Sequence, residues 1–381
     1  MIIDKISILN FKNIAEAELA FSPKMNCFFG DNGMGKTNLL DALYYLSFTK
    51  NYTNLSDSQL ITHNQDFSVL QGYYADKEAV EEIYCGIKRN RKKVFKRNKK
   101  EYERLSEHIG LIPMVMISPA DIELIQGGSD ERRKFADMLI CQYDKGYMHA
   151  LIHYNKALQQ RNALLKMHPQ PPEGGLKSPS GDSGVFEIWE EQMSVSGAII
   201  HEKRKAFIEG FRPLFKEYYR IISNENETVD FGYESHLDKA SLADLLTGKR
   251  EQDKILGYTS VGIHKDDFTF LLDKYLIRKI GSQGQNKTYL IALKLAQFSF
   301  LVQKGSSVPI LLLDDLFDKL DAKRVEQIIQ LVAKPEFGQI FITDTNRKYL
   351  DEILASMQHN YKLFHVEKGI INETDRIASH R

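Results

Sequence analysis

Cysteine is scarce in this sequence, and Cys27, Cys85 and Cys141 show neither a Cys-x-x-Cys pair nor the spacing of metal ligands. This argues against both a disulfide framework and a zinc framework, and it suits a reducing compartment. No apolar run approaches the length of about eighteen residues that a membrane-spanning helix needs. The start, Met1–Ile6, has the pattern of a strand and lacks the basic and then apolar layout of a signal peptide. We therefore expect a cytoplasmic protein without a membrane partner.

An excess of charge of one sign is also missing, because Lys plus Arg and Asp plus Glu both number 51. Net charge thus says nothing about a nucleic-acid partner, and any basic surface must come from local clustering. What is present is an ordinary globular composition, with 43% hydrophobic and 27% charged residues. A chain of 381 residues has room for one large domain or two lobes.

The order of patterns along the chain predicts two lobes. Short β-type runs and turns fill residues 1–76, and strand and helix patterns, including a strand over Tyr258–Gly262, return after residue 257. Between them we expect helices over about 130–167 and 188–223, joined by a flexible loop at about 168–187 that is rich in Pro, Gly and Ser. The fold class is therefore α/β, with a nucleotide-binding lobe I from 1–120 and 255–381 and a mostly helical lobe II at 121–254.

A glycine-rich loop follows the apolar strand that ends at Phe29 and precedes a helix, and it matches the pattern GxxxxGK[ST]. The backbone N–H groups of such a loop converge on phosphate oxygens, which suits ATP. Lys36 can reach the β- and γ-phosphates, and the Thr37 hydroxyl can bind Mg²⁺. The alternative is a glycine-rich turn that matches by accident. The loop consists of Gly30, Asp31, Asn32, Gly33, Met34, Gly35, Lys36 and Thr37.

A second motif is the apolar run Ile310–Leu313, which is followed by Asp314 and Asp315. It predicts a buried parallel strand that delivers carboxylates to the edge where α/β proteins bind ligands. Asp314 suits Mg²⁺ binding, and Asp315 suits a catalytic role with Lys36, in which it polarises the attacking water. The alternative is a core strand followed by an acidic helix cap.

Between these motifs stands Gly281–Gln285, a Ser in a glycine-rich segment ahead of a helix. Such a segment can form a second anion-binding nest. Because the P-loop already binds the phosphates of its own subunit, this nest is not needed for the same nucleotide. We expect Ser282, Gly284 and Gln285 to close over a nucleotide that is held by a second copy of the chain.

The three motifs together resemble the ABC-type ATPase head, whose LSGGQ-like signature has a glycine where Gln283 stands here. Within that superfamily the chain is similar to the RecF family of bacterial DNA replication and repair proteins. The matching segments run along nearly the whole sequence. They include Leu9–Asn13, Asn32–Ala42, Ser118–Ile122, Glu131–Arg133, Gln160–Leu165, Trp189, Gly262–Asp267, Gly281–Gln285 and Leu313–Asp315.

The resemblance implies an ABC-type head as lobe I, a helical lobe II and no long coiled coil. It adds Lys12 and Asn38 to the nucleotide-binding residues, and Lys12 keeps the charge but not the planar fork of the family's usual arginine. It assigns Leu320–Arg324 to the D-loop at a dimer interface and places Thr343 where transporters have a switch histidine. No Q-loop glutamine is visible, and Pro119–Asp121 occupies that region.

For function, the resemblance implies an ATP-dependent homodimer that binds single-stranded, double-stranded or gapped DNA. It also implies recombinase loading at single-strand gaps and SOS induction, with RecO and RecR as partners. Asp315 is one methylene shorter than the glutamate that is common in ABC proteins, so we expect slow hydrolysis that serves as a switch.

A basic segment offers a candidate DNA contact. Lys88 to Lys100 holds nine Lys or Arg among thirteen residues, with Phe95 available to stack on a base. The alternative is a charged hairpin edge that prevents strand pairing. The candidate DNA-binding residues are Lys92, Lys93, Lys96 and Arg97.

Two other functional classes stay open: another ABC-head ATPase, SMC-like or linked to a nuclease, and a transporter ATPase subunit. A nuclease would need an extra acidic metal cluster, which lobe II does not show. A transporter subunit would need a Q-loop glutamine and a switch histidine. We interpret His264 as a structural residue and not as a catalytic base.

Overall fold

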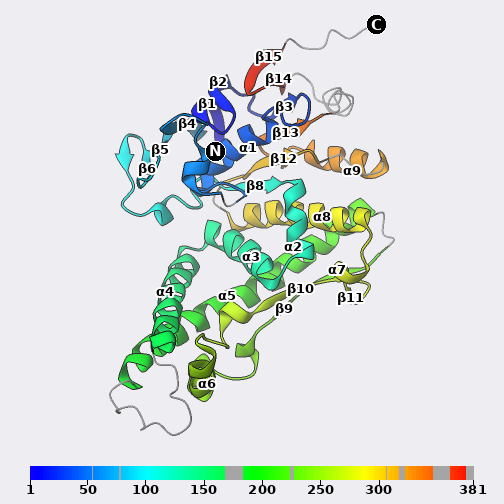
Figure 1. Cartoon of the computed structure of the whole chain (residues 1–381). Coiled ribbons are helices and arrows are strands. Elements are labelled where there is room, and N and C mark those ends of the chain that lie inside the picture. The colour runs from blue at the N-terminus through cyan, green and yellow to red at the C-terminus, as the bar shows by residue number, and fades with distance from the viewer. Residues whose placement is uncertain are drawn as a thin grey trace. The chain divides into compact units, whose positions relative to one another are not determined.

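Figure 1 shows a computed structural model of the chain, which describes residues 1–53, 55–76, 79–167, 183–223, 227–305, 307–316, 322–345 and 361–374. Its Cα positions divide it into two compact units. The head unit consists of Met1–Ile122, Tyr218–Asn226 and Ser282–Arg381, and the helical unit consists of Glu123–Glu217 and Glu227–Gly281. Residues 255–281, which the sequence analysis assigns to lobe I, fall in the helical unit in this division.

A mostly parallel sheet in the head unit has the strand order β15-β14-β3-β13-β12-β8, and only β15 runs antiparallel to its neighbour. Its strands are β3 (Met25–Phe29), β8 (Met114–Ile117), β12 (Ile310–Asp314), β13 (Ile340–Asp344), β14 (Tyr361–Glu367) and β15 (Ile370–Thr374). β12 and β13 are buried along their whole length, as parallel strands that are covered on both faces must be. The register places Asp314 beside Thr343 and Asp344 beside Phe29, so the ends of three strands share one edge.

The second sheet of the head unit is antiparallel, with the order β2-β1-β4-β5-β6-β7. Its strands are β1 (Ile2–Phe11), β2 (Ile14–Ala20), β4 (Phe67–Asp76), β5 (Ala79–Lys88), β6 (Val94–Arg97) and β7 (Lys100–Glu101). α1 (Lys36–Phe48) contacts strands of both sheets, and its residues 39–48 are all buried. A helix between two sheets needs apolar side chains on more than one face, which explains the weak polar pattern of α1.

Further helices of the head unit complete the layers around the parallel sheet. α8 (Gln283–Lys304) contacts β8, and α9 (Ala322–Val332) lies in the chain between β12 and β13. Three single turns of 3₁₀-helix also occur, η1 (Asp57–Leu60), η2 (Leu105–Glu107) and η3 (Pro119–Asp121).

The helical unit combines long helices with a small antiparallel sheet in the order β11-β10-β9. Its helices are α2 (Ile122–Gln126), α3 (Ser129–Tyr143), α4 (Lys145–Met167), α5 (Ser183–Ser223), α6 (Leu242–Leu256) and α7 (Ile277–Ile280), with η4 (His236–Asp238) and η5 (Ile263–Lys265). Its strands are β9 (Val229–Glu234), β10 (Asp267–Leu272) and β11 (Tyr275–Leu276). Residue 122 of α2 and residues 218–223 of α5 cluster with the head unit. Of the expected loop at 168–187, residues 168–182 lie outside the described residues.

The prediction of one continuous helix over about 130–167 is wrong, because the helix is interrupted at Asp144. The backbone N–H of Asp144 still bonds to Ile140, while its carboxylate accepts a hydrogen bond from the N–H of Tyr147 at 2.8 Å. Asp144 therefore ends one helix and caps the next.

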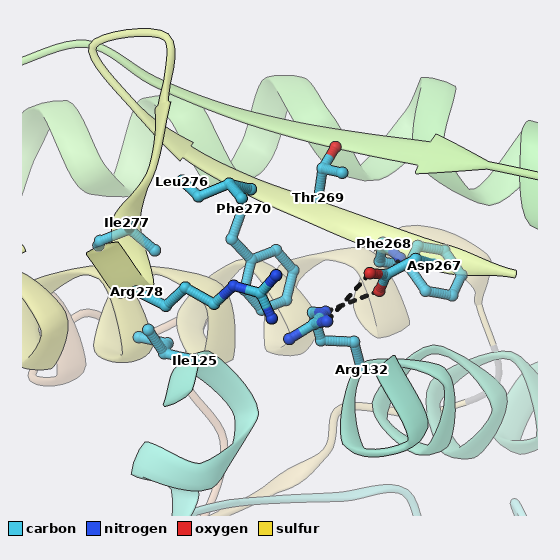
Figure 2. A pocket seen from close by; sticks show the side chains of 9 residues that line it. All are labelled: Ile125, Arg132, Asp267, Phe268, Thr269, Phe270, Leu276, Ile277 and Arg278. Atoms are coloured by element: carbon cyan, nitrogen blue, oxygen red, sulfur yellow. Dashed lines mark hydrogen bonds and ion pairs between the residues drawn. The ribbon is translucent and has the colours of Figure 1, made fainter. Parts of the chain in front are cut away.

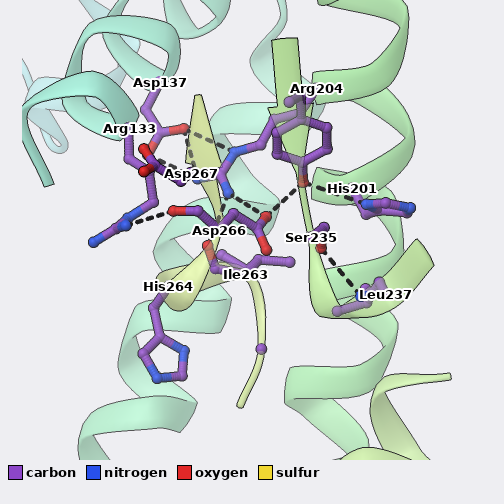
Figure 3. Close-up of polar contacts among 12 residues, drawn as sticks. Arg133, Asp137, His201, Arg204, Ser235, Leu237, Ile263, His264, Asp266 and Asp267 are labelled. Carbon is purple, nitrogen blue, oxygen red and sulfur yellow. Dashed lines mark hydrogen bonds and ion pairs between the residues drawn. The ribbon is translucent and has the colours of Figure 1, made fainter. Parts of the chain in front are cut away.

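Buried charges join the elements of the helical unit (Figure 3). Arg204 of α5 forms ion pairs with Asp137 of α3 at 2.9 Å and with Asp266 at 2.8 Å. The hydroxyl of Tyr233 also donates to the Asp266 carboxylate. Burial raises the pKa of Asp266, and the Arg204 guanidinium acts in the opposite direction. Removing one partner of such a pair leaves an uncompensated buried charge, so this cluster fixes how α3, α5 and β9 pack.

A second buried arginine explains the segment Gln160–Leu165. Arg161 of α4 is fully buried, and its guanidinium contacts Glu190 of α5 at 3.0 Å and Asp253 of α6 at 2.8 Å. Arg161 thus ties three helices together. Its role in the described structure is internal to the helical unit.

The predicted strand over Tyr258–Gly262 does not form. The N–H groups of Thr259 and Ser260 bond to the side chains of Asn162 and Asp253, at 2.8 and 3.0 Å, and not to a neighbouring strand. Side chains of α4 and α6 have taken the bonds that a strand would need.

His264 has a structural role, as the sequence analysis interprets it. Its Nε2 donates to the Thr259 carbonyl at 3.0 Å, and its Nδ1 accepts from the Tyr154 hydroxyl at 2.8 Å. Burial lowers the pKa of His264 to about 4, so the ring is neutral near pH 7. Within the described part of the chain, no helix is both long enough and apolar enough to span a membrane.

Candidate nucleotide-binding site

The P-loop connects the end of β3 to the start of α1 at the centre of the parallel sheet. Gly30 has φ 153° there, and a Cβ at this position would lie 2.2 Å from the carbonyl oxygen of Val366 in β14. Only glycine allows the loop to leave the sheet so close to the neighbouring strand. Gly35 caps α1 with φ 115°, which directs the N-terminus of the helix into the loop.

Met34, in the middle of the P-loop, is held from two sides. Its carbonyl accepts hydrogen bonds from the Asn13 side chain at 3.2 Å and from the N–H of Gly369 at 2.8 Å. The Asn13 amide oxygen also accepts from Asn38 of α1 at 2.7 Å. The turns after β1 and β14 therefore shape the loop before any ligand enters. Asn13 and Gly369 are functional residues that pattern reasoning did not single out.

Lys36 points back into the curve of the loop. Its Nζ donates to the carbonyl oxygens of Gly30 at 2.6 Å and Asp31 at 3.0 Å. Burial lowers the pKa of Lys36, while the nearby carboxylates, Asp315 and Asp314 first, act in the opposite direction. An ammonium group held at the loop by two carbonyl oxygens can donate strong hydrogen bonds to an anionic phosphate that enters the loop.

Asp314 is the centre of the site's hydrogen bonds. Its carboxylate accepts from the Thr37 hydroxyl at 2.9 and 3.0 Å and from the Thr343 hydroxyl at 2.7 Å. The side chain is 3% exposed, and burial raises the pKa of Asp314, while the bonds from Thr343 and Thr37 oppose that rise. The structure therefore brings together the predicted pair Thr37 and Asp314, which come from distant parts of the chain.

Asp315 occupies a left-handed backbone conformation at the end of β12, with φ 45°. Its N–H bonds to both the carbonyl oxygen and the hydroxyl of Thr343, at 3.2 and 3.1 Å. Thr343 thus positions both acidic residues. By resemblance Thr343 has only a place in the site. A Thr-Asp pair at the end of an apolar strand is a signal that could identify both Thr343 and the buried Asp344.

These groups surround a cavity of about 140 Å³. Its lining is polar and comes from the P-loop, α1 and the end of β12. The lining residues are Asn32, Gly33, Gly35, Lys36, Thr37, Asn38, Asp314 and Asp315. Such a cavity can take phosphate groups on the N–H and ammonium side and a cation on the carboxylate side.

The donor set fits Mg²⁺. The Thr37 hydroxyl and the Asp314 carboxylate are hard oxygen ligands that already touch one another. Mg²⁺ typically takes only one or two protein oxygens and completes its shell with phosphates and water. Accordingly, the described residues contain no cluster of three or more His, Cys, Asp or Glu that could hold a metal by themselves.

Lys12 does not line the cavity, although the sequence analysis lists it among the nucleotide-binding residues. Its Nζ forms an ion pair with Asp41 of α1 at 2.6 Å. Asp41 also accepts a hydrogen bond from the N–H of Tyr52 at 2.7 Å. In the described structure Lys12 therefore braces α1, and a direct contact with nucleotide stays a prediction.

The predicted signature nest lies at the start of α8. The Ser282 hydroxyl accepts from the N–H of Gln285 at 3.2 Å, and the Gln285 side chain accepts from the N–H of Ser282 at 2.7 Å. This capping box leaves Ser282 exposed, and a Cβ at Gly284 would meet the Arg324 side chain at 3.0 Å. None of the described residues that line the cavity comes from this nest. Leu320 and Asp321 of the expected D-loop lie outside the described residues, and α9 begins at Ala322.

The basic segment forms the edge hairpin of the antiparallel sheet, with β6 and β7 as its outer strands. Lys93 pairs with Asp57 at 3.2 Å, and Arg97 makes a two-pronged contact with Glu81 at 2.6 and 2.7 Å. Lys96 lies over the Tyr84 ring at 5.7 Å, and Lys92 is exposed.

The expectation that Phe95 stacks on a base is wrong. Its side chain is 1% exposed and packs against Tyr102 and His108, with ring centroids 6.2 and 4.8 Å away. The ring is part of the core and is not available to stack on a base.

A second cavity lies within the helical unit (Figure 2). Its volume of about 20 Å³ is near that of one water molecule. Figure 2 shows Arg132 turned toward Asp267, and the two form an ion pair at 2.8 Å. This space is too small for a nucleotide, so the P-loop cavity is the candidate site.

A family model and related proteins indicate the same family for this chain. A family model described as the RecF/RecN/SMC N terminal domain matches residues 2–372. A DNA replication and repair protein RecF of Azobacteroides pseudotrichonymphae is 69% identical over 373 residues, which cover 98% of this chain and 100% of that protein. Another RecF, of Parabacteroides distasonis, is 60% identical over 97% of this chain and 98% of its own.

Solved structures agree with this result. A structure of the recombination mediator protein RecF with ATP, from the RecFOR pathway, matches with a TM-score of 0.85 and 29% identity over 98% of both chains. An Smc head domain from Pyrococcus furiosus matches with a TM-score of 0.56 and 17% identity, over 98% of this chain and 96% of that one, and so shares the fold alone. The expected fold, an α/β ATPase head with an inserted helical lobe, is confirmed.

Proposed function

The chain belongs to the RecF family of DNA replication and repair proteins, and from this premise we propose that ATP closes two copies of it on DNA. The observation that carries the proposal is the cavity in which Lys36, Thr37 and Asp314 meet. That arrangement supports a nucleoside triphosphate held by its phosphates at the N-terminus of α1.

Each residue of the site has a chemical task in this proposal. The P-loop N–H groups and Lys36 bind the β- and γ-phosphates, and Thr37 with Asp314 holds Mg²⁺. When bound, Mg²⁺ supplies positive charge to the phosphate oxygens. Asp315 orients the attacking water, and the Thr343 bonds to its N–H fix where its short side chain begins. A carboxylate with so little reach supports weak hydrolysis. In this proposal DNA stimulates the hydrolysis, which acts as a switch.

The homodimer follows from the position of the signature nest. Ser282, Gly284 and Gln285 are not among the described residues that line the cavity of their own subunit. An exposed Ser282 at a helix N-terminus suits a γ-phosphate that is presented by a second copy. ATP would then bridge the two heads, and hydrolysis would reopen them.

On the biological side, we propose that the dimer binds single-stranded, double-stranded or gapped DNA in the cytoplasm. It would help load recombinase at single-strand gaps and support SOS induction, together with RecO- and RecR-type mediators. Support comes from the solved RecF structures, which are described as a recombination mediator of the RecFOR pathway.

The test is the Ser282→Arg variant, because a large cation in the nest should block the second copy but not the P-loop. We expect ATP to bind the monomer with unchanged affinity and the ATP-dependent dimer to disappear in light scattering. The control is Ser241→Arg, since Ser241 is likewise an exposed N-cap whose hydroxyl accepts from Asp244 at 3.2 Å. Both changes remove a cap of about 1 kcal/mol. A dimer that still forms in Ser282→Arg would contradict the proposal that the nest of one copy contacts the nucleotide of the other.

A further inference from the structure

A buried lysine lies on the helix that carries the signature nest, away from the cavity. Lys294 of α8 is 5% exposed, and its Nζ donates to the Asp121 carboxylate at 2.8 Å and to the Tyr52 hydroxyl at 3.0 Å. The same ammonium group lies 5.5 Å from the centre of the Tyr52 ring. Nothing in the proposed chemistry of the cavity uses this group.

The two partners of Lys294 come from different parts of the head unit. Asp121 ends the turn after β8, the strand that pairs with β12 and therefore ends next to Asp314. Tyr52 follows α1, and its hydroxyl donates to Asp121. Burial and the nearby Asp121 charge raise the pKa of Tyr52 well above its usual value, so this hydroxyl keeps its proton.

The contacts continue to the P-loop helix. The N–H of Tyr52 bonds to Asp41 at 2.7 Å, and Asp41 pairs with Lys12 at 2.6 Å. Asp41 stands about one helical turn after Thr37, so it moves with the part of α1 that meets the phosphates. The residue after Lys12 is Asn13, which braces the P-loop at Met34.

Stability alone is a weak reason for such a cluster. A buried ion pair is often no more stabilising than apolar residues of the same volume, because both charges lose their hydration. The cluster does provide a defined orientation, because a charged pair that shares a hydroxyl fixes how three elements are arranged. Here those elements are the end of α1, the turn after β8 and the signature helix α8.

The geometry points to Tyr52, Asp121 and Lys294 as positioning residues that orient the signature helix α8 according to the state of the P-loop. Phosphate binding at the start of α1 shifts Asp41 and Tyr52, and Tyr52 acts on Lys294 both directly and through Asp121. The nest at Ser282 then takes the position that receives the second copy. This inference rests on the proposed ATP-dependent dimer, and it identifies how that dimer senses its nucleotide.

The experiment compares Lys294→Met with Lys304→Met, a matched change at an exposed lysine of the same helix. ATP affinity is measured with a fluorescent ATP analogue under conditions in which the protein is monomeric. Dimerisation is measured by sedimentation velocity in ATP and in ADP. For Lys294→Met we expect ATP affinity within about threefold of the wild type and an ATP-dependent dimer weakened about tenfold, which is a common size for coupling between sites. Lys304→Met should change neither.

Two further variants separate positioning from support of the fold. Lys294→Arg keeps a cation that can reach Asp121, and it should recover most of the dimer. Tyr52→Phe removes one hydroxyl and keeps the ring, which packs edge-on against Tyr44 at 4.9 Å. It should weaken the dimer in the same sense, and combining it with Lys294→Met should add little, because both changes break one chain of contacts.

The outcomes distinguish this inference from the function on which it rests. A wild-type chain that stays monomeric in ATP would contradict the proposed function itself. A normal wild-type dimer that Lys294→Met and Tyr52→Phe leave intact would overturn the inference alone. The inference would also be overturned if both variants lost the dimer only in proportion to a lower melting temperature and a lower ATP affinity.

Discussion

Thr343→Val tests whether the two carboxylates of the site depend on one hydroxyl. The Thr343 hydroxyl donates to Asp314 at 2.7 Å and accepts from the N–H of Asp315 at 3.1 Å. Valine has nearly the same shape and can make neither bond. Because Thr343 is 0% exposed, no bulk water stands ready to replace the lost donor.

The size of the effect follows from the charge of the acceptor. A hydrogen bond to a charged group contributes about 1.5–3 kcal/mol, and about 1.4 kcal/mol corresponds to a tenfold change in an equilibrium constant. Burial already raises the pKa of Asp314, and the bond from Thr343 is the strongest opposing influence. Its loss raises the pKa further, so Mg²⁺ must compete with a more tightly held proton. We expect the Mg²⁺ concentration for half-maximal ATP binding to rise, by up to about tenfold at the acid end of the titration.

The assay is a Mg²⁺ titration of ATP-analogue binding at several pH values. The defect should be largest at low pH and shrink as the pH rises, because the carboxyl group then loses its proton without help from the metal. Thr343→Ser keeps the hydroxyl and serves as the control. A Mg²⁺ requirement that is unchanged in Thr343→Val, or a defect that is the same at every pH, would refute the reasoning.

Three further predictions concern separate parts of the chain. Burial lowers the pKa of His264 to about 4, so as the pH falls the unfolded chain gains a proton before the folded chain does. Between pH 7 and pH 5 the unfolding free energy of the wild type should therefore fall by about 2 kcal/mol more than that of His264→Asn, as measured by urea titration. Gly369→Ala places a Cβ 2.1 Å from the carbonyl oxygen of Asn13, at φ 82°, and should weaken ATP binding. The control is Gly257→Ala, at φ 71° with open space around it, which should cost only about 1 kcal/mol of stability in thermal melts. If Lys92 and Lys96 both contact phosphates, changing both to Ala should reduce the slope of log DNA affinity against log salt concentration by about 1.8 in anisotropy titrations. An unchanged slope would show that the hairpin does not contact DNA.

The nucleotide site was largely predictable because its signals are local. The P-loop pattern fixes Lys36 and Thr37 within a few residues, and an unbroken apolar run ending in acid identifies Asp314. Parallel strands bring such ends to one edge, so the meeting of Thr37 and Asp314 follows from topology. The bracing by Asn13 and Gly369 has no comparable signal, because it depends on how distant turns approach Met34.

Two of the wrong predictions share a physical cause, which is contact with side chains from outside the segment, whereas the break at Asp144 is local. The segment 258–262 has the composition of a strand, but Asn162 and Asp253 take the bonds of its N–H groups. Phe95 stands in a run of basic residues, where a ring could stack on a base, yet Tyr102 and His108 cover it. Neither contact can be read from spacing along one segment.

The double support of Met34 sets an order of events during synthesis. Gly369 donates to the Met34 carbonyl, and β14 is the strand beside which Gly30 turns. On a translating ribosome the P-loop and Asn13 emerge early, but Gly369 and β14 emerge only after the whole helical unit has been made. A nascent chain therefore has the motif long before it has the site. Nucleotide can be captured only once the closing strand has docked, and this late, long-range step makes folding slow and leaves it open to a chaperone.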